Sequence, residues 1–209
     1  PLSVGGVLFS GDNNGIMYAI EAKTGKEKWR YESEGAIKSK PVYVGGKIIF
    51  TNSTGKAIAV DAESGEWLWH SGGEKPFGKM AIMSMVGPTL LDEQRVAVAF
   101  LDGSLGVLNV EDGSELWRKK LGRAVDFRDI GGGIIKSPFG IIVSVYNTGL
   151  FWIDDKSGAT LREMDDVKYP GAIAFDGKNM LAVATGSSRL VSVNAASGNV
   201  NWSFNFKKG

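Results

Sequence analysis

Cysteine is absent from the 209 residues of this chain, and His70 is its single histidine. The lack of cysteine excludes disulfide bonds, thiolate metal sites and a cysteine nucleophile, but it leaves the compartment open. One histidine cannot build a histidine-rich metal site. Because His70 follows Trp69 at a position expected on an outer strand, we expect a solvated surface side chain rather than a catalytic base.

Long apolar runs and an excess of one charge are also missing. No segment approaches the roughly 18 apolar residues of a transmembrane helix. The chain has 24 basic and 23 acidic residues, without a basic stripe that would indicate nucleic acid binding. It begins at Pro1 without an initiator methionine, so we expect a processed or trimmed piece whose export signal has been removed.

Glycine and tryptophan, by contrast, are frequent, with 29 and 6 residues, and they recur in a ten-residue phrase. The phrase begins as IEAKTGKEKW at Ile20 and returns as VDAESGEWLW, LNVEDGSELW, IDDKSGATLR and VNAASGNVNW. Its glycines are Gly25, Gly65, Gly113, Gly158 and Gly198, separated by 40, 48, 45 and 40 residues. A period of about 40–45 residues is typical of four-stranded propeller blades.

Each position of the phrase has a physical interpretation. The acidic or amide residue four positions before the glycine can accept backbone N–H groups inside a turn, and the glycine can adopt a positive φ. The residue four positions after it is Trp29, Trp69, Trp117, Arg162 or Trp202. We expect these tryptophans to be buried between neighbouring blades with the indole N–H on a polar partner, in five similar contacts. Trp67 lies outside this register and is expected to face the opposite side.

The strands before each phrase repeat as well, so the sequence predicts an all-β fold, a single β-propeller domain of four-stranded antiparallel blades. We place five blades at about 1–35, 36–74, 75–122, 123–167 and 168–209, with about twenty strands and no helix. No segment remains for a strand exchanged between the termini. We therefore favour a compact five-bladed ring over a segment of a larger propeller, because an open arc would expose blade faces.

The phrases resemble the quinoprotein-type (PQQ-like) β-propeller repeat, and YAIEAKTGKEKW and IAVDAESGEWLW are its closest copies. This family includes dehydrogenases that use pyrroloquinoline quinone, lipoproteins of the BamB type in the bacterial outer-membrane assembly machine, and sensor ectodomains. The fold alone does not choose among them. The resemblance is greatest to the BamB type, and it implies an extracytoplasmic protein at the outer membrane whose lipid anchor has been lost from this chain.

A catalytic site is not expected. The resemblance to the dehydrogenases implies a quinone on the propeller axis with Ca²⁺, a catalytic Asp, an Arg, a Trp floor and often a vicinal disulfide. This chain cannot form that disulfide, and its acidic residues, such as Asp61 and Asp154, occupy turn positions. Two glycine-containing segments, Asp12–Gly15 and Asp102–Gly106, are interpreted as hairpin turns rather than Ca²⁺ loops. Gly131–Gly133 is interpreted as a flexible connection. We predict no catalytic residue, cofactor or metal site.

The two longest connectors are candidates for a partner-binding surface. The step from the phrase tryptophan to the next inner strand takes 12 residues in the first repeat but 17 in the second and third. Both long connectors should emerge on the same face of the disc, where irregular loops favour binding. The candidate contact residues are Phe77, Met80, Met83, Met85, Arg123, Phe127 and Arg128. Alternatively, Met83 and Met85 line the channel and Phe127 enters the core.

The sequence therefore favours a non-catalytic scaffold for protein–protein interaction in outer-membrane protein assembly, located in the periplasm. The alternatives are a ligand-sensing ectodomain of a larger signalling protein and, third, a fragment of a quinone-dependent dehydrogenase.

Overall fold

The structure is a computed structural model that describes residues 1–73, 86–121 and 130–207. These residues form five four-stranded antiparallel sheets and no helix. The strands are β1 (Leu2–Val4), β2 (Val7–Gly11), β3 (Ile16–Glu21), β4 (Glu27–Glu32), β5 (Val42–Val44), β6 (Lys47–Thr51), β7 (Lys56–Asp61), β8 (Trp67–Gly72), β9 (Thr89–Leu90), β10 (Arg95–Ala99), β11 (Ser104–Asn109), β12 (Glu115–Lys120), β13 (Ile130–Ser137), β14 (Gly140–Val145), β15 (Gly149–Ile153), β16 (Thr160–Met164), β17 (Pro170–Phe175), β18 (Met180–Thr185), β19 (Arg189–Asn194) and β20 (Val200–Asn205).

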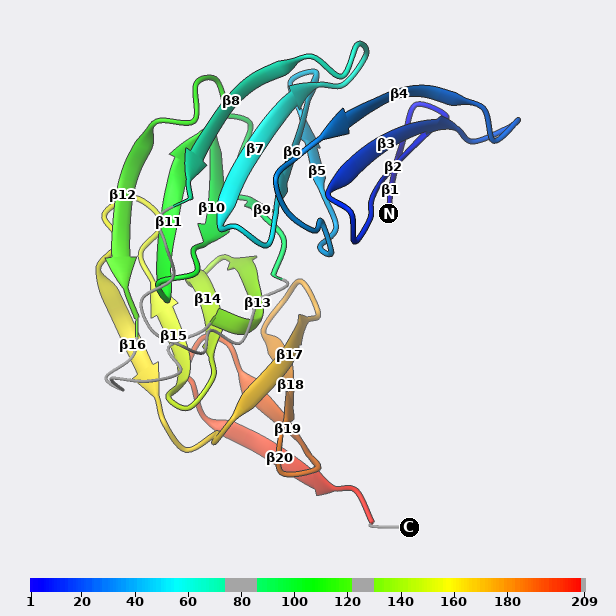
Figure 1. Cartoon of the computed structure of the whole chain (residues 1–209). Helices are drawn as coiled ribbons and strands as arrows, with labels where there is room; N and C mark the ends of the chain where they lie inside the picture. Colours follow the sequence, from blue (N-terminus) through cyan, green and yellow to red (C-terminus); the bar gives the residue numbers. More distant parts are fainter. Residues whose placement is uncertain (74–85, 122–129, 208–209) are drawn as a thin grey trace.

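Each sheet consists of four consecutive strands, and we call the sheets blades 1 to 5 in chain order. The first strand of each blade lies on the inner side of the arrangement and the fourth on the outer side (Figure 1). The prediction of an all-β propeller with five four-stranded antiparallel blades is confirmed.

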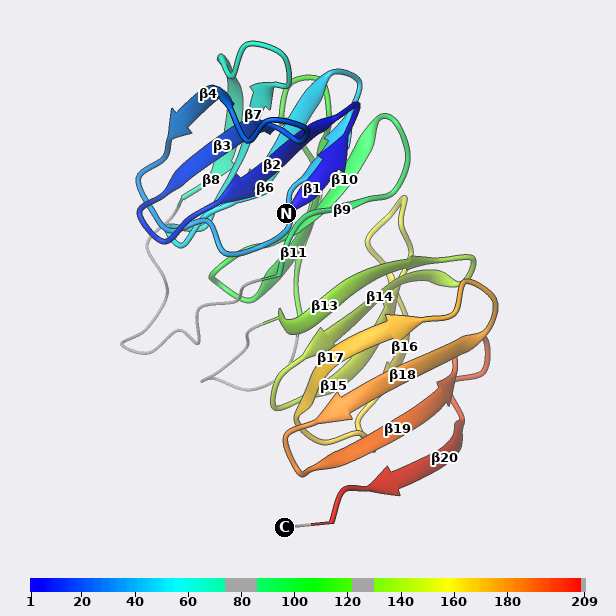
Figure 2. The ribbon, with the colours of Figure 1, turned by 90° about the vertical axis from the view of Figure 1, so that its right-hand side faces the viewer.

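The blades do not close into a ring. They follow one another along an open arc, and blades 1 and 5 stand apart in both views (Figures 1 and 2). The predicted five-bladed ring is therefore wrong. Five blades that follow one another at the rotation seen between neighbours do not complete a circle.

The core consists of four hydrophobic clusters, one at each junction between successive blades. Phe9 and Met17 of blade 1, for example, pack with Ile48 and Phe50 of blade 2. The middle strands of the inner blades are covered on both faces, and all five residues of β15 are buried. This burial explains near-continuous apolar sequences such as RVAVA in β10, which alternation alone would not predict.

A β-bulge recurs at the same place in every blade, where the third strand pairs with the fourth. In blade 2 it falls between Ala59 and Val60, so that Ala59 pairs with Trp69 and Val60 pairs with Trp67. In a regular strand, Trp67 and Trp69 would share a face because they are two residues apart. The bulge separates them. Trp69 is 4% exposed and Trp67 is 54% exposed.

The inner edge of blades 4 and 5 depends on glycine. Gly131–Gly133 lies within β13, so the interpretation of this segment as a flexible connection is wrong. A Cβ on Gly132 would lie 1.6 Å from the carbonyl oxygen of Gly171 in β17, which shows how closely the two strands approach. The Ser144 hydroxyl also donates to this oxygen over 3.0 Å. The glycines therefore allow two inner strands to pack backbone against backbone.

Candidate functional site

The repeated turns hold their acidic side chains by local hydrogen bonds. Asp61 Oδ1 accepts the backbone N–H groups of Ser64 and Glu63 over 2.8 and 2.9 Å, and these bonds lower the pKa of the carboxyl group. The Ser157 hydroxyl and backbone N–H lower the pKa of Asp154 in the same way. These carboxylates are acceptors that shape turns, and none of their oxygens is directed at a shared site.

The first three junctions join a tryptophan of one blade to the phrase turn of the next. Trp29 Nε1 donates to the Ala62 carbonyl oxygen over 3.1 Å. A Cβ on Gly65 would lie 2.6 Å from the Trp29 ring. The glycine is needed both for its positive φ and for the close approach of the indole.

The next two junctions repeat this geometry. Trp69 donates to Val110 over 3.0 Å and Trp117 donates to Asp155 over 3.2 Å. The acceptor in each case lies three residues before the phrase glycine, as Ala62 does before Gly65. Tryptophans 29, 69 and 117 thus carry equivalent contacts between blades.

The fourth junction reaches the same result with different residues. Arg162 stands in the tryptophan position, and a Cβ on Gly198 would lie 2.7 Å from the Arg162 Cδ. The indole comes instead from Trp152, whose Nε1 donates to the Ala195 carbonyl over 2.7 Å. Arg162 pairs with Trp152 across β15 and β16, and its guanidinium lies 5.7 Å from the Trp152 ring centroid.

Trp152 is a residue that the sequence reasoning missed, although a signal was present. The cross-strand partners of the phrase position stand ten residues earlier and are Ala19, Ala59, Val107, Trp152 and Ser192. The only large residue in this series accompanies the only lost tryptophan.

Trp202 corrects the expectation of five similar contacts. In the part of the chain that the structure describes, no further blade packs on it, and its side chain is 48% exposed. Correspondingly, no described atom lies within 4 Å of a Cβ built on Gly25 of blade 1. The described residues therefore form four such junctions, and among them Trp202 and Gly25 have no counterpart on another blade.

A cleft of about 570 Å³ lies at the inner edge of blades 2, 3 and 4. Its described lining residues are Lys40, Pro41, Val42, Val86, Gly87, Pro88, Thr89, Leu90, Gly131, Gly132, Gly133 and Ile134. Two threonine hydroxyl groups form hydrogen bonds between neighbouring segments of its wall. Thr51 donates to the Val86 carbonyl over 3.3 Å, and Thr89 donates to the Ile134 carbonyl over 3.0 Å. We call this feature the axial cleft.

Three of the four ends of the two long connectors meet beside the axial cleft. The first connector returns to the described chain at Val86, and the second leaves it at Leu121 and returns at Ile130. All three residues belong to one hydrophobic cluster between blades 3 and 4, in which Leu121 and Ile130 are buried. The packing thus brings the end of the first connector close to both ends of the second.

The candidate contact residues themselves lie outside the described residues. They are Phe77, Met80, Met83, Met85, Arg123, Phe127 and Arg128. What the structure supplies is the position of the connector ends, and the predicted contacts stay predictions.

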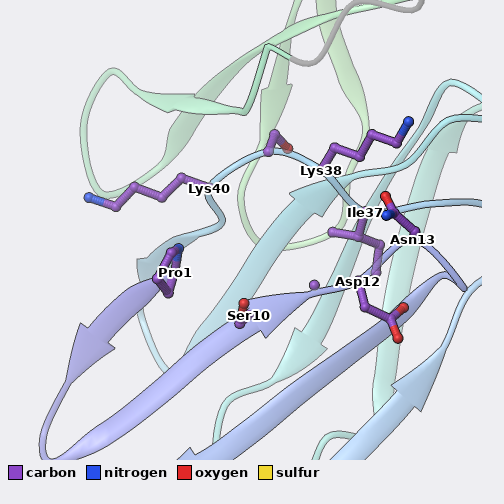
Figure 3. Close-up of a pocket in the computed structure, with 9 residues that line it drawn as sticks. Pro1, Ser10, Asp12, Asn13, Ile37, Lys38 and Lys40 are labelled. Carbon is purple, nitrogen blue, oxygen red and sulfur yellow. The ribbon is translucent and has the colours of Figure 1, made fainter.

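A smaller pocket of about 380 Å³ lies between blades 1 and 2 and is shown in Figure 3. Lys38 and Lys40 point away from each other, and the Asp12 carboxylate is bound by its own turn, through the N–H groups of Asn14 and Ile16 over 2.9 and 2.8 Å. Its polar groups do not converge on a common point, so this pocket lacks the arrangement that fixes a small ligand.

The described residues do not fit a bound quinone and its cation. The described lining of the axial cleft contains no carboxylate, arginine or tryptophan. Across all the described residues, no three His, Asp or Glu side chains lie close enough together to hold a metal ion. The described residues also contain no helix that is long and apolar enough to cross a membrane.

These features place the chain in the class of β-propeller proteins built from quinoprotein-type repeats. The family model described as outer membrane protein assembly factor BamB matches residues 1–134. The chain belongs to this family.

Similar proteins include both assembly factors and enzymes. BamB of Nitrosomonas eutropha is 29% identical over 117 residues, which cover 56% of this chain and 26% of that protein. Polyvinylalcohol dehydrogenase of a Sphingopyxis species is 36% identical over 74 residues, which cover 32% of this chain and 11% of that protein. The crystal structure of BamB from Moraxella catarrhalis superposes with a TM-score of 0.79 at 22% identity and covers 96% of this chain. This chain spans 61% of that structure, and about a quarter or less of the two curated relatives.

Proposed function

We propose that this chain is a non-catalytic scaffold that binds protein partners during outer-membrane protein assembly. One observation carries the proposal: Val86, Leu121 and Ile130 place one end of the first long connector and both ends of the second in a single cluster beside the axial cleft. Two connectors of unlike sequence that emerge together provide a unique surface on an otherwise repetitive molecule.

The repeated turns cannot provide such a surface. The phrase glycines of blades 2 to 5 are each covered by a side chain of the preceding blade. The connectors supply what the turns lack, because residues 74–85 contain one Phe and three Met and residues 122–129 contain two Arg and one Phe. Aromatic residues, methionine and arginine are enriched in protein interfaces.

The family supports this assignment and a location. Its model is described as an outer-membrane assembly factor, so we place this chain on the periplasmic side of the outer membrane, in contact with the assembly machinery. The partner is a protein, and nucleic acid plays no part in the proposal.

The test is retention by the detergent-solubilised outer-membrane assembly complex of the source cell. The quadruple variant Phe77→Ser, Met80→Ser, Arg123→Ala and Arg128→Ala should bind at least about tenfold more weakly while it keeps its melting temperature, since each anchor lost from an interface costs about 1 kcal/mol or more. A folded quadruple variant that binds as tightly as the unmodified chain would disprove this surface.

A matched control removes two apolar and two basic groups elsewhere. The control variant carries Leu68→Ser, Leu116→Ser, Lys23→Ala and Lys156→Ala. Each of these residues is exposed on an outer strand or a phrase turn. This variant should bind like the unmodified chain. If the unmodified chain itself does not bind the complex, the scaffold proposal fails in favour of a ligand-sensing ectodomain.

A quinone-dependent dehydrogenase is the second candidate, because a relative named alcohol dehydrogenase (quinone) is 28% identical over 138 residues and matches 56% of this chain. The described lining of the axial cleft does not fit the cofactor, as shown above. Dye reduction with alcohols after addition of pyrroloquinoline quinone and Ca²⁺ would reverse this ranking. We expect no turnover above the rate without protein.

A further inference from the structure

Two tyrosine rings lie side by side at the edge of the molecule to which the second long connector returns. The ring centroids of Tyr146 and Tyr169 are 5.6 Å apart, and the ring planes are tilted by 48°. Tyr146 follows Val145, which pairs with Ile130, the residue at which the second connector returns to the described chain. The ring pair is therefore continuous with the connector ends beside the axial cleft.

Hydrogen bonds between blades 4 and 5 hold the two rings in place. The Ser144 hydroxyl, two residues before Tyr146, donates to the Pro170 carbonyl oxygen over 3.0 Å, and Ser144 is fully buried. The Tyr169 carbonyl oxygen accepts the Gly186 N–H over 2.9 Å. Because these contacts lie at the ends of β14, β17 and β18, the rings are presented by the sheets themselves, which hold a site more precisely than loops do.

Tyr169 has a backbone conformation that costs an aromatic residue free energy. Its φ is +50°, in the left-handed region where the Cβ atom crowds the backbone. The fold does not impose this conformation, since Lys40 and Gly87, which also precede the proline at the start of an inner strand, lie outside the positive-φ region. The ring is 45% exposed, and none of the four clusters of described residues includes it. Strain retained at an exposed aromatic residue points to a role in binding.

Uncharged polar residues surround the rings. Tyr146 begins a turn that continues with Asn147, and the neighbouring turn of blade 5 contains Gly186, Ser187 and Ser188. The side chains of Asn147, Ser187 and Ser188 are exposed. Tyrosine combined with Ser, Gly and Asn is the composition of antibody paratopes, in which the rings supply contact area and the small residues supply adaptable hydrogen bonds. This composition fits the surface of a protein partner.

We propose that Tyr146 and Tyr169 form an aromatic anchor of the same partner-binding surface to which the two long connectors belong. The proposal rests on the proposed function, because it assigns the rings to the same protein partner. An apolar side chain of that partner packs on the two rings, and its neighbouring backbone groups bond to the phenol hydroxyls. The binding surface thus extends from the junction of blades 3 and 4 to the junction of blades 4 and 5.

Tyr169→Asn tests the proposal because it separates binding from folding. Asparagine adopts a positive φ more readily than an aromatic residue, so this variant should unfold at a urea concentration no lower than the unmodified chain. Loss of the ring should weaken retention by the detergent-solubilised outer-membrane assembly complex at least about tenfold, as for an interface hot spot. A variant that loses stability but binds like the unmodified chain overturns the proposal, because the ring would then serve the fold alone.

Two further variants and a matched control sharpen the test. Tyr146→Ser removes the second ring and should also weaken binding, whereas Tyr169→Phe keeps its ring and should bind more tightly than Tyr169→Asn. Tyr43→Asn is the control, since Tyr43 is 40% exposed but lines a pocket with Gly45 and Gln94, at hairpin turns away from the connector ends. It should bind like the unmodified chain. Equal weakening by Tyr43→Asn and Tyr169→Asn would overturn the proposal, because any exposed tyrosine would then contribute.

Failure of the anchor and failure of the proposed function give different patterns. If the unmodified chain binds the complex, the quadruple connector variant binds weakly and Tyr169→Asn binds normally, the anchor is wrong and the scaffold proposal stands. If the unmodified chain does not bind the complex, both fail. If the quadruple connector variant binds normally but Tyr169→Asn does not, the partner binds at the rings and the connectors are not its contact surface.

Discussion

The first and fourth blade junctions make the same contact with different residues. At the first junction, Trp29 from an outer strand covers Gly65 and donates to Ala62. At the fourth, Arg162 covers Gly198, and Trp152 from the adjacent strand donates to Ala195. At the first junction the small residue Ala19 pairs with Trp29 across the two strands. At the fourth junction the equivalent position holds the large residue Trp152, which pairs with Arg162.

This difference shows what a junction requires. The carbonyl three residues before the phrase glycine receives an indole N–H in both cases, because a buried carbonyl without a donor is costly. The strand that supplies the indole can vary as long as the cross-strand pair fills the same space. Arg162 fits because its aliphatic part lies against the glycine and its guanidinium lies near the Trp152 ring.

Removal of a buried indole from the second or the fourth junction should have the largest effect. Trp69→Ala and Trp152→Ala each delete a ring that is at most 4% exposed and leave a carbonyl without its donor. We expect each to lower the free energy of unfolding by about 3–5 kcal/mol, measured by urea denaturation. A loss below about 1 kcal/mol for Trp152→Ala alone would show that Trp152 has not taken the place of the missing phrase tryptophan.

Moving the tryptophan from position 152 to position 162 should restore part of the stability that Trp152→Ala removes. The double variant Trp152→Ala, Arg162→Trp recreates the residues of the first junction within the fourth. We expect it to unfold with a free energy at least about 1 kcal/mol above that of Trp152→Ala, because residues in contact do not contribute additively. Arg162→Trp alone should destabilise the chain, since Trp152 already fills the space. Additive losses in the double variant would contradict the equivalence of the two junctions.

Alanine at the phrase glycines separates backbone strain from packing. Gly25 and Gly65 have φ +73° and +78°, so the strain of an alanine is nearly equal at both. Only at Gly65 does a Cβ meet the tryptophan ring, 2.6 Å away. Gly65→Ala should therefore cost about 1–3 kcal/mol more than Gly25→Ala in the unfolding of the single chain. Equal losses would mean that the ring moves aside freely.

The smallest effect is expected at Trp67. The bulge turns this ring out of the junction, and it is 54% exposed beside His70. Trp67→Ala should change the free energy of unfolding by no more than about 0.5 kcal/mol, as for most surface substitutions. A loss comparable to that of Trp69→Ala would show that the two rings share one face.

Much of the fold could be predicted because the phrase is local and repeated. Its period predicted five blades and located the outer strands. The lengths of individual strands could not be predicted as well: β9, the inner strand of blade 3, contains only Thr89 and Leu90. Pro88 precedes it and has no backbone N–H to donate to a strand ladder. Gly131–Gly133 failed as a prediction because its role depends on Gly171, which lies about 40 residues away in sequence.

Closure and the partner surface could not be predicted in the same way. The repeat period gives the number of blades but not the rotation from one blade to the next, so the open arc could not be read from it. For the partner surface, the sequence indicated unusual connectors but not that Leu121 and Ile130 would meet in one cluster. The contact residues within those connectors remain a prediction for the binding experiment.

The four separate clusters also determine how the chain opens. Each blade is held by its neighbours alone, so cooperativity passes from blade to blade as in a linear array. Blades 2, 3 and 4 are held by two clusters each, whereas blades 1 and 5 are held by one. Unfolding should therefore begin at the ends of the arc, with β20 the first strand to exchange its amide hydrogens and the buried strands of blade 3 among the last.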